Sequence, residues 1–220
     1  MFYLFHHIPK TAGTSVLAGL SGLFRVVRDY HRSTSEEDLG LFDVQRIDIA
    51  ALGERDILCG HWNLRGRHLY HRYPELDSHK PRKITFIRDP LSTAQSGVRY
   101  GIQQGWCKPG TQNEALISRA GYISAILDCN ELTYKSVLDG YWFVGDSGRL
   151  NEGFELLTSL VQKQAIHVPR VNTTDEIGIT FSNEAIELFI ERSRVDYMIY
   201  EYAKTLYTRR LQAHIALAGR

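Results

Sequence analysis

A short segment near the start of the chain carries groups that suit the binding of a phosphate. Residues 7–15, HIPKTAGTS, lie between an apolar, aromatic run and a segment with apolar residues at helical spacing. In a small-residue loop between a strand and a helix, successive backbone N–H groups and the positive end of the helix attract an anion. Gly13 permits close approach, Thr14 and Ser15 add hydroxyl donors, and Lys10 adds a mobile charge. The segment predicts an anion-binding loop, with an ordinary strand-to-helix turn as the alternative.

The order of residues in this loop differs from that of the common nucleotide loop, G-x-x-x-x-G-K-[ST]. Lys10 comes at the front of the segment, and no later strand end offers an acidic residue well placed to hold magnesium. A kinase or NTPase would need both features. The loop is therefore predicted to bind phosphate in a different way, and a phosphoryl-transfer enzyme stays open as one alternative.

A second group of polar residues follows a strand-like run in the middle of the chain. Arg88, Asp89 and Pro90 come directly after Ile-Thr-Phe-Ile, and Ser96 lies eight residues beyond the arginine. An Arg at the carboxyl end of a parallel strand points into the same crevice as the first loop. A Ser on the first turns of the next helix can join that Arg on one phosphate, while Asp89 and Pro90 suit the helix start. These residues predict a second phosphate contact in one crevice.

Together the two segments resemble the two signature motifs of sulfotransferases that use 3′-phosphoadenosine 5′-phosphosulfate (PAPS). IPKTAGTS is similar to the loop that this family uses for the 5′-phosphosulfate, and IRDPLSTAQS is similar to its 3′-phosphate motif. The first form most resembles the carbohydrate-type branch, which includes heparan and dermatan sulfate O-sulfotransferases and many bacterial relatives. Further similarity runs through YWFVGDSGRLNEGFELL, HVPRVNTT and VDYMIYEYA, so the resemblance covers most of the chain.

The resemblance implies that a sulfuryl group moves from PAPS to a hydroxyl of an acceptor, with 3′-phosphoadenosine 5′-phosphate (PAP) as the product. In this family pattern Lys10 stabilises the leaving phosphate, and Arg88 and Ser96 hold the 3′-phosphate. The 5′-phosphate would lie on the backbone and hydroxyl groups of Thr11, Ala12, Gly13, Thr14 and Ser15. Fixed donors of this kind can carry the developing charge, so no metal is expected. A module that binds PAP or PAPS without catalysis is a further alternative.

A general base is also needed, and His61 is the predicted one. It follows the strand-like run DILCG, so it should lie in the same crevice as the first loop. Its Gly60-His61 setting resembles the Gly-His that supplies the base in the uronyl 2-O-sulfotransferase branch, although Cys59 stands where that branch has a second His. The spacing of His61, His68 and His71 leaves a metal site as an alternative. The other histidines are expected to flank the first strand's end, as His6 and His7, or to be surface or hydrogen-bonded groups, as His31, His79, His167 and His214.

The stretch from residue 61 to residue 83, here called the 61–83 segment, is notably basic. It holds six Lys and Arg residues against Glu75 and Asp77, a balance of +4, where the whole chain has a formal charge of +1. Because it starts at the predicted base, Trp62, Arg65 and Arg67 are predicted to bind the acceptor. An acidic saccharide is the predicted acceptor, with Trp62 and Trp106 as faces for sugar rings. A solvated basic surface is the alternative interpretation.

The elements that must position these groups are predicted from short apolar runs and from the helical patterns around them. The apolar runs lie at residues 2–8, 25–30, 56–61, 83–89 and 141–146. Their spacing leaves room for crossover helices, which favours a parallel sheet. Helical periods follow at residues 13–24, 96–104, 113–128, 151–164, 182–194 and 195–215. The predicted fold is α/β: one three-layer, P-loop-like domain over residues 1–220, with a central parallel sheet of about five strands and a helical C-terminal third.

The composition narrows the class of protein. The 220 residues are 43% hydrophobic and 23% charged, which excludes disordered and collagenous chains, and the charge of +1 argues against nucleic acid or an anionic membrane as partner. Cys59, Cys107 and Cys129 form no C-x-x-C pair and suit a reducing compartment. With no apolar run of ~18 to 20 residues and no signal peptide, a cytoplasmic enzyme of bacterial style is expected. The sequence leaves open the acceptor class beyond a hydroxyl, and the oligomeric state.

Overall fold

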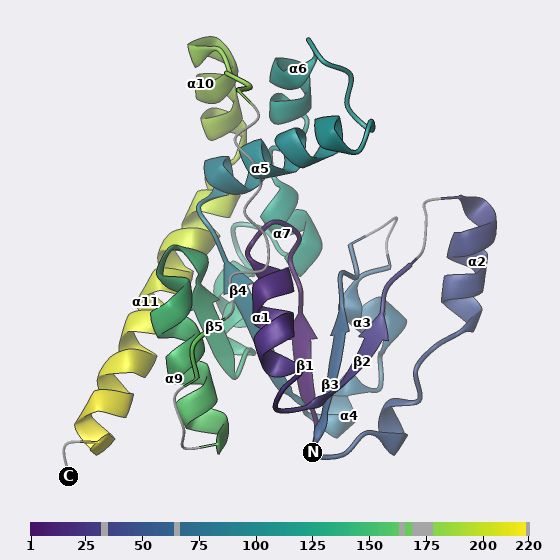
Figure 1. Cartoon of the computed structure of the whole chain (residues 1–220), viewed down its shortest axis with the longest axis vertical. Coiled ribbons are helices and arrows are strands. Elements are labelled where there is room, and N and C mark those ends of the chain that lie inside the picture. Colours follow the sequence, from purple (N-terminus) through teal and green to yellow (C-terminus); the bar gives the residue numbers. More distant parts are fainter. Residues whose placement is uncertain (32–34, 64–66, 163–165, 169–177, 219–220) are drawn as a thin grey trace.

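The centre of the protein is a sheet of five parallel strands. A computed structural model describes residues 1–31, 35–63, 67–162, 166–168 and 178–218 of the chain. The strand order is β2-β3-β1-β4-β5 (Figure 1). The strands are β1 (Tyr3–His6), β2 (Arg25–Asp29), β3 (Asp56–Gly60), β4 (Arg82–Ile87) and β5 (Phe143–Asp146). Each lies within, or one residue outside, an apolar run expected from the sequence, so the predicted α/β class and strand count are confirmed.

Helices pack on both faces of the sheet, which gives three layers. On one face, Phe5 of β1 shares a core with Val16 of α1 (Gly13–Leu20) and Leu157 of α9 (Leu150–Gln162). On the opposite face, Leu4 shares a core with Leu69 of α3 (Leu69–Arg72). Successive strand residues point to opposite faces, and both faces of β1 are buried. Such strands are apolar almost throughout, which is why their sequence runs were recognisable.

The helix after β4 begins at a defined cap. In α5 (Pro90–Gln103) the carboxylate of Asp89 accepts a hydrogen bond from the backbone N–H of Ser92 at 2.7 Å, and Pro90 occupies the first helical position. Both features stabilise a helix start. The predicted start of this helix at Asp89 and Pro90 is therefore confirmed, and it fixes where Ser96 lies relative to the end of β4.

Further helices surround this framework. Helix α11 (Arg194–Ala218) lies along β5 and α7 (Tyr122–Leu127), and the described residues after β5 are helical wherever they are regular, as predicted for the C-terminal third (Figure 1). The remaining helices are α2 (Glu36–Val44), α4 (Leu76–His79), α6 (Gln112–Ile117), α8 (Tyr134–Asp139) and α10 (Asn183–Arg192), with 3₁₀ turns η1 (Ile49–Ala51) and η2 (Ser147–Arg149).

The helix boundaries differ from the sequence expectation in two ways. The single helix predicted over residues 113–128 is two helices, α6 and α7, because Gly121 takes a φ of 74° between them. A φ in this left-handed region favours glycine and interrupts a helix. Helices α2, α3, α4 and α8 were not predicted. Two of these have four residues each, so they contain little more than one helical period and leave no apolar repeat to detect.

Two kinds of feature are absent from the described residues. No helix in this part of the chain combines the length and the apolar character needed to cross a membrane. Likewise, no group of three or more His, Cys, Asp or Glu side chains within the described ranges is arranged to hold a metal ion. The three cysteines are free thiols.

Candidate functional site

The loop between β1 and α1, residues 7–12, is held by contacts from the ends of two other strands. Ser147, directly after β5, donates to the carbonyl oxygen of Thr11 at 2.7 Å. Arg88, directly after β4, donates from Nη1 to the carbonyl oxygen of Lys10 at 3.3 Å. Within the loop, the Thr11 hydroxyl donates to the carbonyl oxygen of Ile8 at 2.8 Å. The loop backbone is thus positioned at the carboxyl edge of the sheet, where parallel α/β folds bind ligands.

The loop takes an unusual backbone conformation for its residue types. Lys10 and Ala12 have φ values of 70° and 65°, in the left-handed region that non-glycine residues seldom adopt. Ala12 is the N-cap of α1, and its side chain makes no cap hydrogen bond. A left-handed residue followed by helical Gly13 turns consecutive N–H groups to one side. The first turn of α1 therefore presents backbone donors that suit an anion.

Gly13 is required by the close approach of His7. A Cβ atom on Gly13 would lie 1.9 Å from both Cδ2 and Nε2 of the His7 ring, so no other residue fits without moving that ring. From the sequence we expected Gly13 to permit the close approach of a phosphate and His7 to flank the end of the first strand. The observed role of the glycine is to let an imidazole lie against the start of α1. In the sequence, the position of His7 directly before Ile-Pro-Lys could have indicated this contact with the start of α1.

Three basic side chains converge beside this loop, namely Lys10, Arg88 and Arg119. Burial lowers the pKa of the Lys10 ammonium, and the charges of Arg88 and Arg119 lower it further. Burial also lowers the pKa of the Arg88 guanidinium, with Asp89 raising it and Arg99 lowering it. The Lys10 ammonium lies 4.1 Å from the centre of the Tyr100 ring. The three basic groups therefore repel one another, and a bound anion would relieve that repulsion.

No carboxylate among the described residues forms an ion pair with any of these three side chains, which we call the unpaired cations. Arg119 was not predicted from the sequence. Its guanidinium lies against α5, because a Cβ atom on Gly97 would be 2.6 Å from Arg119 Nη1. Gly97 follows the buried Ser96, so Arg119 reaches the helix turn that carries the predicted 3′-phosphate serine. Nothing in the local sequence around Arg119 marks it, since its place depends on the turn between α6 and α7.

His61 lies on the other side of the loop, beside two aromatic rings. Its ring centre is 4.6 Å from that of His7 and 4.6 Å from that of Tyr30. Burial is the main cause that lowers the pKa of His61 to about 4, and the charge of His31 contributes to the same shift. The ring is therefore neutral near pH 7. Its Nε2 atom is buried without a hydrogen-bond partner in the described part of the chain. A neutral imidazole with one free nitrogen can accept a proton.

A hydrogen-bonded chain supports this side of the site. Nδ1 of His7 and the hydroxyl of Tyr30 are 3.0 Å apart, and the same hydroxyl is 2.8 Å from the sulfur of Cys59. Burial raises the pKa of Cys59 to about 12 and lowers the pKa of His7 to about 3. Both groups are therefore uncharged near pH 7, and the Cys59 thiol occupies a structural place in the core.

The predicted acceptor residues are placed differently from the expectation. Trp62 is 2% exposed and donates from its indole nitrogen to Asp29 at 2.7 Å, so it offers no face to a sugar ring. Arg67 forms two hydrogen bonds to the Asp43 carboxylate, at 2.6 and 2.5 Å. Arg65 lies outside the described residues. Trp106 is 73% exposed on the surface. Trp62 is therefore part of the core, whereas the acceptor role of Arg67 stays a prediction, since its ion pair with Asp43 lies at the surface.

The 61–83 segment as a whole is less basic toward solvent than its sequence suggests. Arg72 is buried and forms two hydrogen bonds of 2.7 Å to the carboxylate of Asp29, which also accepts from Tyr73 at 2.8 Å. A buried carboxylate at the end of β2 requires such donors. Whether the charge of this segment attracts an acceptor stays a prediction, because Lys83 in the same segment forms no ion pair with a carboxylate in the described ranges. The HVPRVNTT segment lies outside the described residues apart from His167 and Val168.

The fold of the chain is similar to that of a solved sulfotransferase. A crystal structure of a sulfotransferase from Alicyclobacillus acidocaldarius matches it with a TM-score of 0.55, over 92% of this chain and 95% of that chain. The two sequences are 14% identical, a level at which the match shows a shared fold. No protein-family model and no curated protein matches the sequence. The shared fold thus agrees with the α/β, sulfotransferase-like architecture that the two motifs implied.

Proposed function

We propose that the protein is a sulfotransferase that transfers the sulfuryl group of PAPS to the hydroxyl of an acceptor. One observation carries the proposal: three basic side chains, which form no ion pair with a carboxylate among the described residues, lie beside the loop that leads into the start of α1. PAP and PAPS carry negative charge at both the 3′ and the 5′ position, which suits a group of three cations beside the loop. The two sequence motifs and the fold of the solved sulfotransferase support the same assignment.

The proposed roles follow from the positions of the side chains. The acceptor oxygen forms a bond to sulfur as the bond between sulfur and the bridging phosphate oxygen breaks, and the hydroxyl proton moves to Nε2 of His61. The negative charge that develops on the 5′-phosphate is stabilised by Lys10 and by the N–H groups from Gly13 to Ser15. Arg88 and Ser96 hold the 3′-phosphate, and Arg119 adds a charge beside Ser96.

A saccharide hydroxyl is the first acceptor to test, because IPKTAGTS resembles the carbohydrate-type branch. Acidity of the saccharide is not required by this proposal, since Trp62, Arg67 and Arg72 are engaged with Asp29 and Asp43. Acidic and neutral saccharides should therefore be compared directly. A marked preference for acidic ones would point to basic groups outside those paired in the 61–83 segment.

Ligand-induced thermal stabilisation tests the nucleotide assignment. PAP should raise the melting temperature more than 5′-AMP, which lacks the 3′-phosphate but is otherwise matched. Stabilisation by Mg·ATP with none by PAP would favour the phosphoryl-transfer alternative and defeat the proposal. Release of PAP from PAPS in the presence of an acceptor then separates an enzyme from a module that binds nucleotide without catalysis.

A further inference from the structure

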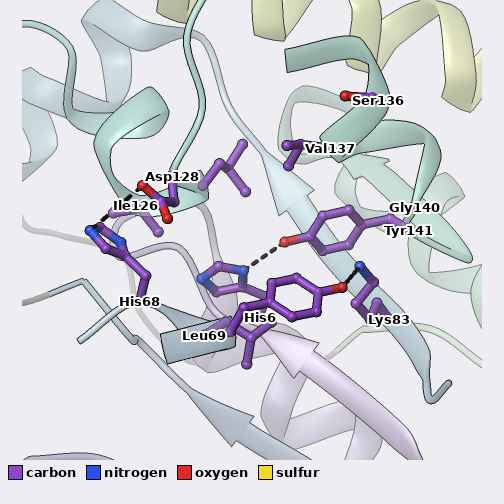
Figure 2. A pocket seen from close by; sticks show the side chains of 12 residues that line it. His6, His68, Leu69, Lys83, Ile126, Asp128, Ser136, Val137, Gly140 and Tyr141 are labelled. Carbon is purple, nitrogen blue, oxygen red and sulfur yellow. Dashed lines mark hydrogen bonds and ion pairs between the residues drawn. The ribbon is translucent and has the colours of Figure 1, made fainter. Parts of the chain in front are cut away.

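A pocket of about 300 Å³ lies on the face of the sheet opposite α1. Its floor includes His6 of β1 and Lys83 of β4, and its walls come from α3, α7 and α8 (Figure 2). His6 follows Phe5, which packs with α1, so alternation along the strand places His6 on the other face. The nucleotide proposed above lies at the start of α1. This pocket is therefore a separate feature that sulfuryl transfer does not explain.

One end of the pocket carries a lysine without an acidic partner. Lys83 donates from its ammonium to the hydroxyl of Tyr70. The ammonium lies 4.9 Å from the ring centre of Tyr70 and 5.0 Å from that of Tyr141. No carboxylate in the described ranges forms an ion pair with it. The two rings hold the ammonium in place, and a lysine without an ion pair can donate hydrogen bonds to a carboxylate.

The floor of the pocket carries a buried imidazole nitrogen. His6 is 2% exposed, and its Nδ1 atom is 2.6 Å from the hydroxyl of Tyr141. Its Nε2 atom makes no hydrogen bond of normal geometry in the described part of the chain, although a backbone group of His61 lies close enough to raise the pKa of His6. In either tautomer Nε2 offers a donor or an acceptor, and leaving it unpaired is unfavourable. Figure 2 shows His6 between Lys83 on one side and the His68–Asp128 pair on the other.

We propose that this pocket binds a small aromatic carboxylate with a polar ring substituent. The carboxylate accepts from Lys83, the ring lies among the apolar walls, and the substituent pairs with Nε2 of His6. Leu69, Leu127 and Val137 supply those walls, which suit a ring rather than a sugar. One ammonium without a neighbouring arginine suits a carboxylate better than a phosphate, which usually takes several charged donors.

Calorimetric titration of the full chain with 4-hydroxybenzoate tests the proposal. Saturable binding is expected, with 4-hydroxybenzamide, its neutral counterpart, about tenfold weaker or more, and benzoate a few-fold weaker. Lys83→Met should weaken 4-hydroxybenzoate by about tenfold or more. The matched control is Lys135→Met, because the Lys135 ammonium also lies over two tyrosine rings, those of Tyr134 and Tyr202, but outside the pocket. It should leave the affinity unchanged.

A second variant keeps the test independent of Lys83. Val137→Phe fills the pocket from a partly buried position and should abolish binding while the melting temperature and the PAP response stay as in the parent protein. Two results would overturn the proposal: no saturable binding of 4-hydroxybenzoate to the parent protein, or binding that survives both Lys83→Met and Val137→Phe. Equal affinity for the benzamide would overturn the role given to the lysine charge.

Discussion

Basic side chains in two regions of this molecule differ in how their charges are balanced. At the carboxyl edge of the sheet, Lys10, Arg88 and Arg119 have no ion pair among the described residues, and the charges of Arg88 and Arg119 add to burial in lowering the pKa of Lys10. In the 61–83 segment, Arg67 and Arg72 are each bound by two hydrogen bonds to one carboxylate. The three side chains of the first region carry unpaired charge, whereas these two arginines of the second region form salt bridges.

The difference shows that pairing, rather than the number of charges along the chain, marks a binding region. A cation held by a carboxylate contributes to structure, because removing it leaves a buried or partly buried anion without its partner. Placing a half-buried cation among other cations is unfavourable in free energy, and the binding of an anionic ligand can offset this. Substitutions in the two regions should therefore fail in different ways, one in folding and the other in binding or turnover.

Arg72→Met should have the largest effect on stability. The side chains of Arg72 and Asp29 are each 3% exposed, so the variant leaves a buried carboxylate with Trp62 and Tyr73 as its donors. A loss of about 3 to 5 kcal/mol in the free energy of unfolding is expected from urea denaturation. Asp29→Asn combined with Arg72→Met should recover part of that loss. A loss below about 1 kcal/mol would mean that the pair behaves like an exposed one.

His61→Ala should lower turnover by ~10² or more while PAP still binds, because a lost general base affects the chemical step. Lys10→Ala should have a similar effect through the leaving phosphate. Steady-state rates with PAPS and saturating acceptor measure both. Exposed His79→Ala is the control and should keep parental turnover. Unchanged turnover in His61→Ala would redirect the search for a base to Asp89, His7 or His68.

Arg88→Ala should weaken PAP binding by roughly 2 to 3 kcal/mol, the value of a charge-assisted contact, with little loss of stability. Asp89 attracts the Arg88 guanidinium while Lys10 and Arg99 repel it, so removing its charge should change stability little. Arg67→Ala is the matched arginine in the paired region. It should leave PAP affinity unchanged, since its partner is Asp43. If both variants affected PAP equally, the distinction between the two regions would be lost.

The strand framework could be predicted from the sequence because buried parallel strands are apolar over their own length. The start of α5 could also be predicted, because Asp89 as N-cap and Pro90 as the first helical residue are local sequence signals. The pairing of Asp29 with Trp62 and Arg72 could not be predicted, because these residues come from β2 and from the segment after β3 and meet through sheet order. Arg119 could not be predicted either, because it reaches Ser96 only through the packing of the α6–α7 turn against α5.

The pH dependence of stability concerns three buried histidines that are uncharged near pH 7, namely His7 and His61 beside the loop and His6 in the pocket on the opposite face. Burial holds the pKa values of His6, His7 and His61 at about 3, 3 and 4, below the 6.5 of an exposed imidazole. Between pH 6.5 and about 4 the unfolded chain therefore binds more protons than the folded one. The free energy of unfolding should be highest above pH 6.5. As the pH falls below 6.5 it should decrease by up to ~1.4 kcal/mol per pH unit for each histidine.

Urea titrations at half-unit pH steps measure this slope. His61→Asn should flatten it by up to about a third, because one of the three buried groups no longer titrates. His79→Asn, at an exposed position, should leave the slope as it is. A parental slope that stayed flat down to pH 4 would mean that the three rings gain protons in the folded state without penalty. His61 would then be positively charged in weak acid. It could accept a proton from the acceptor hydroxyl only at a pH above that at which the ring becomes charged.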